Sequence, residues 1–266
     1  MEVRIGCTGW SYAGWQGNFY PGGMEPSAYL RYYSSVFDVT EINSTFYNIP
    51  SSSVARRWNG ETPENFMFAA KLPRSITHEG RLRPGPDLDR FLGAIGPLGG
   101  KLAVLVIQLP PSLSFGEAEP HLDKMARHVP RNYRYAVEGR HASWFSEDSY
   151  RFLRERNLCL VWNEVSGVEN PAPLTSDMVY LRLIGDRSIP EKDFGTVRRD
   201  RSVLVQKWAD RLEAVRDRIS LAVAVANNRF EGFGPVTANK LRVSMELPYA
   251  KWTCTAQRSL ADFGNP

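Results

Sequence analysis

The sequence predicts an α/β protein built as a (β/α)8 barrel, the TIM-barrel fold. Eight short apolar runs recur along the chain, most are hydrophobic almost throughout, and helix-like patterns commonly separate them. Such runs are typical of parallel strands covered on both faces, and their alternation with helices indicates βα units. An open doubly wound sheet is the alternative, because a strand count does not show closure. The predicted strands are Val3–Cys7, Val39–Asn43, Phe66–Lys71, Leu102–Gln108, Tyr133–Glu138, Leu158–Asn163, Met178–Leu183 and Leu221–Ala226.

Helices are expected where a capping residue precedes an apolar stripe with helical spacing. After Ser202, apolar side chains recur from Leu204 to Ile219 at intervals of three or four residues, which gives an amphipathic helix. After Ser146, acidic residues come first and arginines last, an order that the helix dipole favours. Serine and aspartate side chains accept hydrogen bonds from the first free N–H groups of a helix. The candidate starting residues are Ser27, Ser51 or Ser52, Asp87, Ser146 and Ser202.

One connection departs from the alternation of strands and helices. Residues 164–177, EVSGVENPAPLTSD, contain two prolines and a glycine and show no helical pattern. We therefore expect an irregular connection between the sixth and seventh strands. No low-complexity linker divides the chain, so residues 1–266 are expected to form a single TIM-barrel domain.

The composition argues against several classes of protein. The chain is 42% hydrophobic and 23% charged, and its net charge of +4 is a mild basic excess, not that of a dedicated nucleic-acid binder. This charge is compatible with an anionic substrate. No apolar run approaches the ~18 residues of a membrane span and no signal peptide is visible, so we expect no membrane association and a cytoplasmic location. The isolated cysteines, interpreted as structural, are Cys7, Cys159 and Cys254.

Charged side chains stand near the ends of several predicted strands. Ligands bind outside the carboxyl ends of the strands in a barrel, so these residues are candidates for function. Because side chains alternate between the two faces of a strand, we expect Glu41, Lys71 and Glu138 to project inward near the mouth of the barrel. Arg140 and Arg182 belong to the same end. Such clustering of titratable groups favours a site over a simple rim ion pair.

Neutral polar and aromatic side chains accompany these charges. Amides orient a substrate or complete the barrel's own hydrogen bonds, and aromatic rings stack on a ligand or pack loops onto the barrel. We expect at least half of the tryptophans to be structural, and His141 to serve either the site or the capping of its loop. The candidate substrate-binding residues are Trp10, Tyr12, Asn43, Tyr47, His78, Gln108, Arg140, His141, Trp144, Asn163, Arg182, Asn227 and Asn228.

Seven blocks of the sequence carry a resemblance to a known family. They are IGCTGWSYAGWQGNFYPGG, VTEINSTFYNIPS, FAAKLPRSITHE, VIQLPPSL, AVEGRHASWF, VYLRLIG and NNRFEGFGPVTANKLR, which span residues 4–242 in order. In these blocks the chain resembles the YecE-like family, a domain of unknown function numbered seventy-two. The resemblance implies a TIM barrel, which supports the closed barrel over the open sheet, and it supplies no settled activity.

The chain departs from the family pattern at two strand ends. The family usually has His-Gly after the seventh strand, where this chain has Ile184 and Gly185. It usually has Phe-Asn-Asn after the eighth strand, where this chain has Ala226, Asn227 and Asn228. A mechanism that depends on the seventh-strand histidine therefore cannot operate in this chain.

These residues lead us to expect a hydrolase or lyase that acts on a small phosphate- or carboxylate-bearing molecule. Glu41 and Glu138 would transfer protons, and Glu41 is the better candidate for a general base. Lys71, Arg140 and Arg182 would hold the anionic group and stabilise developing charge. Lys71 could also form a Schiff base, although anion binding is the preferred interpretation.

Two other functions stay open at this point. Two carboxylates between aromatic walls would suit a glycoside-processing enzyme if they lie about 5–10 Å apart. Aromatic rings interleaved with arginines would suit a non-catalytic barrel that binds nucleic acid or another ligand. No cofactor is implied, since a divalent metal site built from Glu41, Glu138 and His141 would lack any supporting motif such as HExxH. The sequence does not determine the oligomeric state.

Overall fold

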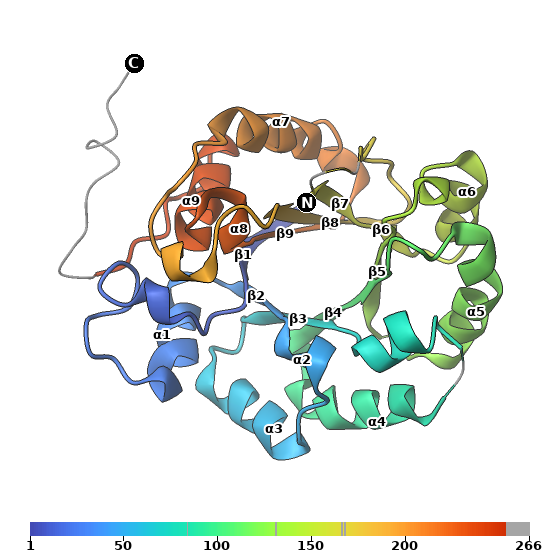
Figure 1. Cartoon of the computed structure of the whole chain (residues 1–266), viewed down its shortest axis with the longest axis horizontal. Coiled ribbons are helices and arrows are strands. Elements are labelled where there is room, and N and C mark those ends of the chain that lie inside the picture. Colours follow the sequence, from blue (N-terminus) through green and yellow to red (C-terminus); the bar gives the residue numbers. More distant parts are fainter. Residues whose placement is uncertain (84, 131, 166, 168, 254–266) are drawn as a thin grey trace.

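The computed structural model describes residues 1–83, 85–130, 132–165, 167 and 169–253, and in them nine parallel strands form one sheet. The sheet curls into a nearly closed barrel with helices around its outside (Figure 1), which confirms the predicted TIM-like barrel. The strand order is β6-β5-β4-β3-β2-β1-β9-β8-β7. The strands are β1 Glu2–Thr8, β2 Val39–Ile42, β3 Met67–Lys71, β4 Leu102–Gln108, β5 Arg134–Glu138, β6 Cys159–Leu160, β7 Trp162–Val165, β8 Met178–Gly185 and β9 Leu221–Ala226.

The barrel nearly closes at the point where one predicted strand is divided into two. The predicted strand Leu158–Asn163 is split by Val161 into β6, which pairs with β5, and β7, which pairs with β8. The amide of Val161 donates to the carbonyl of Val137 on β5 at 2.9 Å, so the chain stays attached to β5 at the break. The two edge strands of the sheet are thus consecutive in sequence, which explains nine strands where eight were predicted.

The helices lie between the strands as the predicted alternation requires. Two predicted caps are confirmed: Ser51 accepts from the amide of Val54, and Ser146 accepts from that of Ser149. The α-helices are α1 Tyr29–Val36, α2 Ser44–Tyr47, α3 Ser52–Glu61, α4 Pro86–Ile95, α5 Phe115–His128, α6 Glu147–Glu155, α7 Ser202–Glu213, α8 Asn228–Glu231 and α9 Gly234–Ser244.

Three predicted helix starts are wrong in detail. Ser27 lies inside a short 3-10 turn, Pro26–Ala28, that runs directly into α1. Asp87 lies in the first turn of α4, where a carboxylate favours the helix dipole without capping it. Ser202 is the first residue of α7, and its hydroxyl donates to Asp200.

The connection between β7 and β8 is irregular, as predicted. The described residues between these strands form neither helix nor strand. Side chains hold this segment against the divided strand: Asn170 donates to the carbonyl of Val161 at 2.9 Å. The hydroxyl of Thr175 donates to the carbonyl of Leu158 at 2.8 Å and accepts from the amide of Leu160 at 2.7 Å. These side-chain bonds hold the irregular segment against the backbone of the divided strand.

Mainly apolar side chains from every second strand position fill much of the barrel interior. Toward the carboxyl ends of the strands, charged side chains take over the inward positions. Cys7 and Cys159 are buried and free, and burial raises the pKa of the Cys159 thiol to about 12, while Cys254 lies outside the described residues. The interior side chains are Val39, Ala69, Val104, Val106, Ala136, Cys159, Val161, Met178, Tyr180, Leu221, Val223 and Val225.

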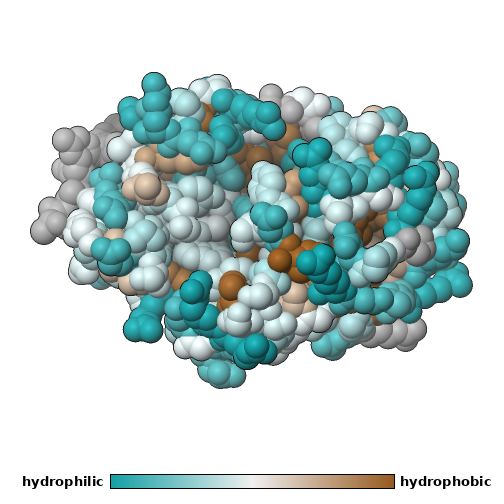
Figure 2. All heavy atoms as spheres, turned by 60° about the horizontal axis from the view of Figure 1, so that its bottom comes forward, coloured by the Kyte–Doolittle hydropathy of each residue, from teal (hydrophilic) through white to brown (hydrophobic). Residues whose placement is uncertain are grey.

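Figure 2 shows one face of the molecule, where hydrophilic residues and residues of intermediate hydropathy cover most of the surface and small hydrophobic patches lie between them. Among the described residues, no helix is long and apolar enough to cross a membrane.

Candidate active site

A single guanidinium joins the two candidate carboxylates. Arg182 lies on β8 with 3% of its surface exposed, and its Nη2 donates to Glu41 Oε1 on β2 at 2.7 Å. Its Nη1 pairs with Glu138 Oε2 on β5. Both carboxylates are fully buried. Three strands that lie far apart in the sequence therefore meet in one ion-paired cluster at the carboxyl end of the barrel.

The remaining carboxylate oxygens are also occupied. Tyr180, two residues before Arg182 on the same face of β8, donates its hydroxyl to Glu41 Oε2 at 2.9 Å. Arg140 donates through Nε to Glu138 Oε1 at 2.8 Å. Burial alone would raise the pKa of Glu138, but the charges of Arg182 and Arg140 lower it to about 2. Glu138 is therefore a fixed anion at neutral pH.

Lys71 is placed differently from the other charges. Its Nζ donates to Gln108 Oε1 at 2.8 Å and lies 4.4 Å from the centre of the Phe46 ring. Among the described residues it forms no ion pair with a carboxylate, although only 7% of it is exposed. Burial, reinforced by the charge of Arg182, lowers the pKa of Lys71 to about 8. Lys71 is thus the group of the cluster that can change protonation near neutral pH.

His78 lies beside Lys71 on the turn Ser75–Glu79, which follows β3. Its ring meets the Phe46 ring edge-on at 5.0 Å, and its Nδ1 lies 2.9 Å from the hydroxyl of Thr77. Partial burial and the charges of Lys71 and Arg140 lower the pKa of His78. His78 therefore lines the mouth as a neutral imidazole at neutral pH.

The mouth holds more hydrogen-bond donors than acceptors. Two carboxylates face two guanidinium groups and the Lys71 ammonium, which leaves one positive charge in excess. Among the described residues, two buried donors at the same level of neighbouring strands have no partner: Arg182 Nε on β8 and Asn163 Nδ2 on β7. An unpaired buried donor costs about 1–3 kcal/mol. A ligand that brings acceptor oxygens would satisfy this arrangement.

The predicted aromatic residues do not share one exposed platform: Trp144 is buried, Trp10 and Tyr12 are partly buried, and Tyr47 is exposed. Trp144 is fully buried and donates through Nε1 to the carbonyl of Leu113 at 3.0 Å. Trp10 meets Trp58 edge-on at 5.6 Å, and Tyr12 donates its hydroxyl to the carbonyl of Thr8 at 2.6 Å. Tyr47 lies on the surface with 73% of its area exposed. These rings pack the loops around the mouth and do not form one stacking surface.

The predicted amides divide between the site and the loops. Gln108 and Asn163 belong to the inward cluster described above. Asn227 donates to Thr8 Oγ1 at 2.7 Å and accepts from the amide of Arg229 at the start of α8. Asn228 is buried and accepts through Oδ1 from Trp15 Nε1 and from the amide of Gly234.

Asn43 and His141 stand at the edges of the site. Asn43 is partly buried at the N-terminal position of α2, just after Glu41 and its strand, and its side chain does not cap the helix. His141 is exposed and accepts from the amide of Ser143 at 3.2 Å, which caps the turn Ala142–Trp144. Of its two predicted roles, the contacts are those of a loop cap.

The geometry does not assemble the metal site considered from the sequence. His141 points to its own turn, while Glu41 and Glu138 are engaged by arginines. Among the residues that the structure describes, no group of three or more His, Cys, Asp or Glu side chains could hold a metal ion.

Two members of the cluster were missed from the sequence. Tyr180 could have been found by strand alternation, because it shares a face with Arg182. Phe46 could not, since it lies on the short helix α2, for which the sequence gives no cap or apolar stripe. The position of Phe46 under the Lys71 ammonium depends on how that turn folds back across β3.

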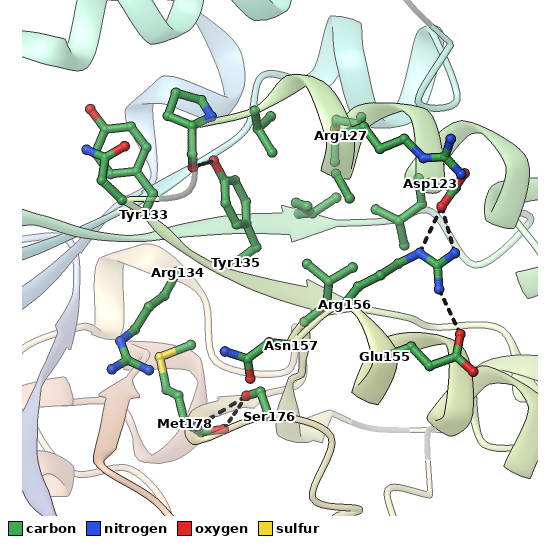
Figure 3. A pocket seen from close by; sticks show the side chains of 18 of the residues that line it. Asp123, Arg127, Tyr133, Arg134, Tyr135, Glu155, Arg156, Asn157, Ser176 and Met178 are labelled. Atoms are coloured by element: carbon green, nitrogen blue, oxygen red, sulfur yellow. Dashed lines mark hydrogen bonds and ion pairs between the residues drawn. The ribbon is translucent and has the colours of Figure 1, made fainter.

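A cavity lies at the amino-terminal end of the barrel, opposite the candidate site. It measures about 870 Å³ and is bounded by the starts of β5 and β8 and by α5 and α6 (Figure 3). Its charges are already paired, because Arg156 binds Asp123 at 2.8 Å and Arg134 binds Asp177 at 2.8 Å. A choice of functional site by cavity volume alone would favour this cavity. We place the candidate site at the opposite end, where a buried lysine amine lies near buried donors that have no partner among the described residues.

Comparison with known proteins identifies relatives across the chain. A family model described as a protein of unknown function, DUF72, matches residues 4–260. The UPF0759 protein YecE of Escherichia coli (strain K12) is 32% identical over 158 residues, which are 59% of this chain and 55% of that protein. The UPF0759 protein YunF of Bacillus subtilis (strain 168) is 30% identical over 155 residues, which are 56% of this chain and 54% of that protein. The chain thus matches about half the length of these curated relatives.

Solved structures share the fold. The crystal structure of a DUF72 family protein from Thermotoga maritima MSB8 is similar with a TM-score of 0.79 at 27% identity, covering 92% of this chain and 100% of that one. A DUF72 family protein from Enterococcus faecalis V583 has a TM-score of 0.74 at 20% identity, covering 93% of this chain and 98% of that one. The second likeness concerns the fold alone.

Proposed function

We propose that this chain, which belongs to the DUF72 protein family of unknown function, is a hydrolase or lyase that acts on a small anionic substrate. One observation carries the proposal: Lys71 is a buried amine bonded to a neutral amide, while arginines and a tyrosine occupy the carboxylate oxygens nearby. This leaves Lys71 as the group with spare donors and an adjustable proton. The substrate carries a phosphate or a carboxylate, which offsets the excess positive charge of the mouth.

The roles within the site follow from the contacts. Lys71 transfers the proton, because a group with a pKa of about 8 exchanges protons readily at neutral pH. Arg140 is partly exposed and binds the anionic group of the substrate. Glu41 and Glu138 were expected to transfer protons, but their contacts suit them better to holding Arg182 and Arg140 in place. Gln108 orients the amine of Lys71.

The other functions considered have weaker support. A glycoside-processing enzyme needs a carboxylic acid that holds a proton near neutral pH, whereas the pKa of Glu138 is lowered to about 2. A nucleic-acid binder needs several exposed rings that together form a stacking surface, whereas Trp144 and Trp162 are buried, Trp10 and Tyr12 are partly buried, and Tyr47 is exposed. We therefore propose a cytoplasmic, single-domain barrel that acts on a small molecule and uses no bound cofactor.

A substrate screen with matched variants tests the proposal. Purified protein is incubated with a panel of phosphate- and carboxylate-bearing small molecules, and the Lys71→Met and Arg140→Gln variants are compared with Lys124→Met, which changes an exposed lysine on α5. We expect Lys71→Met to lower turnover at least about 100-fold and Lys124→Met to leave it unchanged. We expect Arg140→Gln chiefly to raise KM. Full turnover by a folded Lys71→Met variant would refute the proposal.

A further inference from the structure

We propose that Lys71 is a covalent nucleophile whose Nζ forms a Schiff base with an α-keto acid. The inference deepens the proposed function and rests on it, because it places the chemistry at the same amine. It adds a bond between protein and substrate, and it names the substrate class as a carbonyl next to a carboxylate.

Comparison with a second buried lysine shows what is unusual at Lys71. Lys101 is equally buried, with 7% exposed, but its Nζ donates to the carbonyls of Asn59 and Thr62 at 2.7 and 2.8 Å and lies 3.4 Å from Thr62 Oγ1. Those contacts occupy the hydrogens of its ammonium group. Lys71 has a single acceptor among the described residues, Gln108 Oε1, so two of its N–H groups stay available to a ligand.

The surroundings of Lys71 favour the neutral amine that a nucleophile needs. Arg182 donates to the same oxygen, Gln108 Oε1, at 3.3 Å, so the guanidinium lies close to the Lys71 ammonium and repels it. Lys71 is 7% exposed and its Nζ lies against the Phe46 ring, so the amine is largely desolvated. With a pKa of about 8, roughly a tenth of Lys71 is free amine at pH 7. Desolvation and a neighbouring cation are the usual means of activating a lysine.

The remaining donors define the rest of the substrate. Arg140 holds Glu138 through Nε and Nη2, and its side chain is 23% exposed at the mouth, which leaves Nη1 for a carboxylate. Arg182 Nε and Asn163 Nδ2 are buried and also have no acceptor among the part of the chain that the structure describes. A carboxylate adjacent to the reacting carbonyl would place its oxygens within a cluster of donors. An α-keto acid fits this arrangement better than a simple aldehyde.

The covalent step balances without an oxidant or a reductant. The Nζ lone pair attacks the carbonyl carbon, and the carbonyl oxygen takes up a proton to give a carbinolamine. The nitrogen has by then given up one of its two hydrogens. The hydroxyl takes up a further proton and leaves as water, and the nitrogen lone pair forms a C=N bond in place of the C=O bond. The nitrogen keeps its remaining hydrogen, so the product is the protonated imine. The protonated imine withdraws electrons from the neighbouring carbon, which is the chemistry that a lyase requires.

Reductive trapping tests the inference. The intact protein is incubated with pyruvate and sodium borohydride, and the modified lysines are identified by mass spectrometry of proteolytic peptides. We expect one carboxyethyl group on Lys71, formed at least about tenfold faster than on exposed lysines, with Lys101 unmodified. Lys71→Met should abolish the selective adduct. Arg140→Gln should slow trapping by pyruvate more than trapping by acetaldehyde, which has no carboxylate.

The outcomes separate this inference from the proposed function. If Lys71 is labelled no faster than Lys124, or is not labelled at all, the Schiff base is refuted. If Lys71→Met nevertheless abolishes turnover in the substrate screen, acid–base catalysis by Lys71 stands without the covalent step. If selective trapping occurs and Arg140→Gln slows both carbonyl probes equally, the α-keto acid is refuted as the substrate class.

Discussion

Among the individual residues, Arg182 determines what the two carboxylates can do. Its guanidinium donates to both Glu41 and Glu138, and all three side chains are buried. The desolvation of such a group is offset only when the other oxygens and hydrogens are satisfied as well. Tyr180 and Arg140 satisfy the outer carboxylate oxygens. These contacts support the proposal that the acids hold the arginines of a cationic site in place.

Glu138 should make the free energy of unfolding depend on pH in the acidic range. Its pKa is about 2 when folded against an ordinary 4.5, so its stabilising contribution is full above about pH 4.5 and is lost as the pH falls toward 2. We expect Glu138→Gln to cost about 3–5 kcal/mol at pH 7, because Arg182 loses a buried partner, and to cost less at pH 3. Urea denaturation at both pH values measures this. The exposed carboxylate variant Glu64→Gln serves as the control, and an equal cost at both pH values would contradict the account.

The charge of Lys71 should destabilise the folded protein at neutral pH, whereas that of Glu138 stabilises it. Its folded pKa of about 8 lies below the ordinary 10.5, so the unfolded chain binds more protons between these values and stability rises with pH from about 8 to about 10.5. At pH 7 the buried ammonium is destabilising. We expect Lys71→Met to raise the free energy of unfolding by about 1–3 kcal/mol at pH 7, with a smaller gain at pH 10. Lys101→Met removes a buried side chain whose hydrogens are all bonded, and it should destabilise the protein. Destabilisation by both variants would contradict the expected difference between Lys71 and Lys101.

Among the structural elements, β5 and the turn after it position Glu138 and Arg140. Gly139 stands between them, and a Cβ at this position would lie 2.1 Å from Trp144 Cγ. Trp144 is fixed in turn by its bond to the carbonyl of Leu113. The absence of a side chain at Gly139 thus lets the indole pack against the backbone that carries both charged groups.

Filling that space should disturb the strand end. We expect Gly139→Ala to destabilise the protein by about 1–3 kcal/mol through overpacking, and to change the tryptophan fluorescence as Trp144 moves. Gly100→Ala is the matched control, since a Cβ there meets nothing within 4 Å. Thermal unfolding followed by fluorescence measures both variants. If the two variants are equally stable, the contact with Trp144 does not limit the size of the side chain at position 139.

At the level of the whole molecule, periodicity predicted most of the fold and the centre of the site. Continuous apolar runs gave the parallel strands, and strand alternation placed Glu41, Lys71 and Glu138 on the inner face. The division of the sixth strand at Val161 could not be predicted, because its cause is the side-chain bonding of Asn170 and Thr175 from a loop without a pattern.

The chemistry of the site was less predictable than its location. Alternation predicts that two acids and one lysine face inward, with two arginines at the same end of the barrel, but it does not show which of them pair. The pairing depends on side-chain reach across the barrel, as between Arg182 and Glu41, whose positions differ by 141 residues. Likewise, tryptophans at strand ends give no sign of whether they pack inward, as Trp144 does, or face a ligand.

The central claim is that the barrel mouth contains one surplus cation, Lys71, which loses its proton near neutral pH. NMR titration of ¹⁵N-labelled lysine side chains, with Lys71 assigned by its absence in Lys71→Met, tests this most directly. We predict a midpoint of about 8 for Lys71, moving upward when an anionic ligand occupies the mouth. A midpoint near the ordinary 10.5 would contradict the account, because Lys71 would then be a permanent ammonium like any exposed lysine.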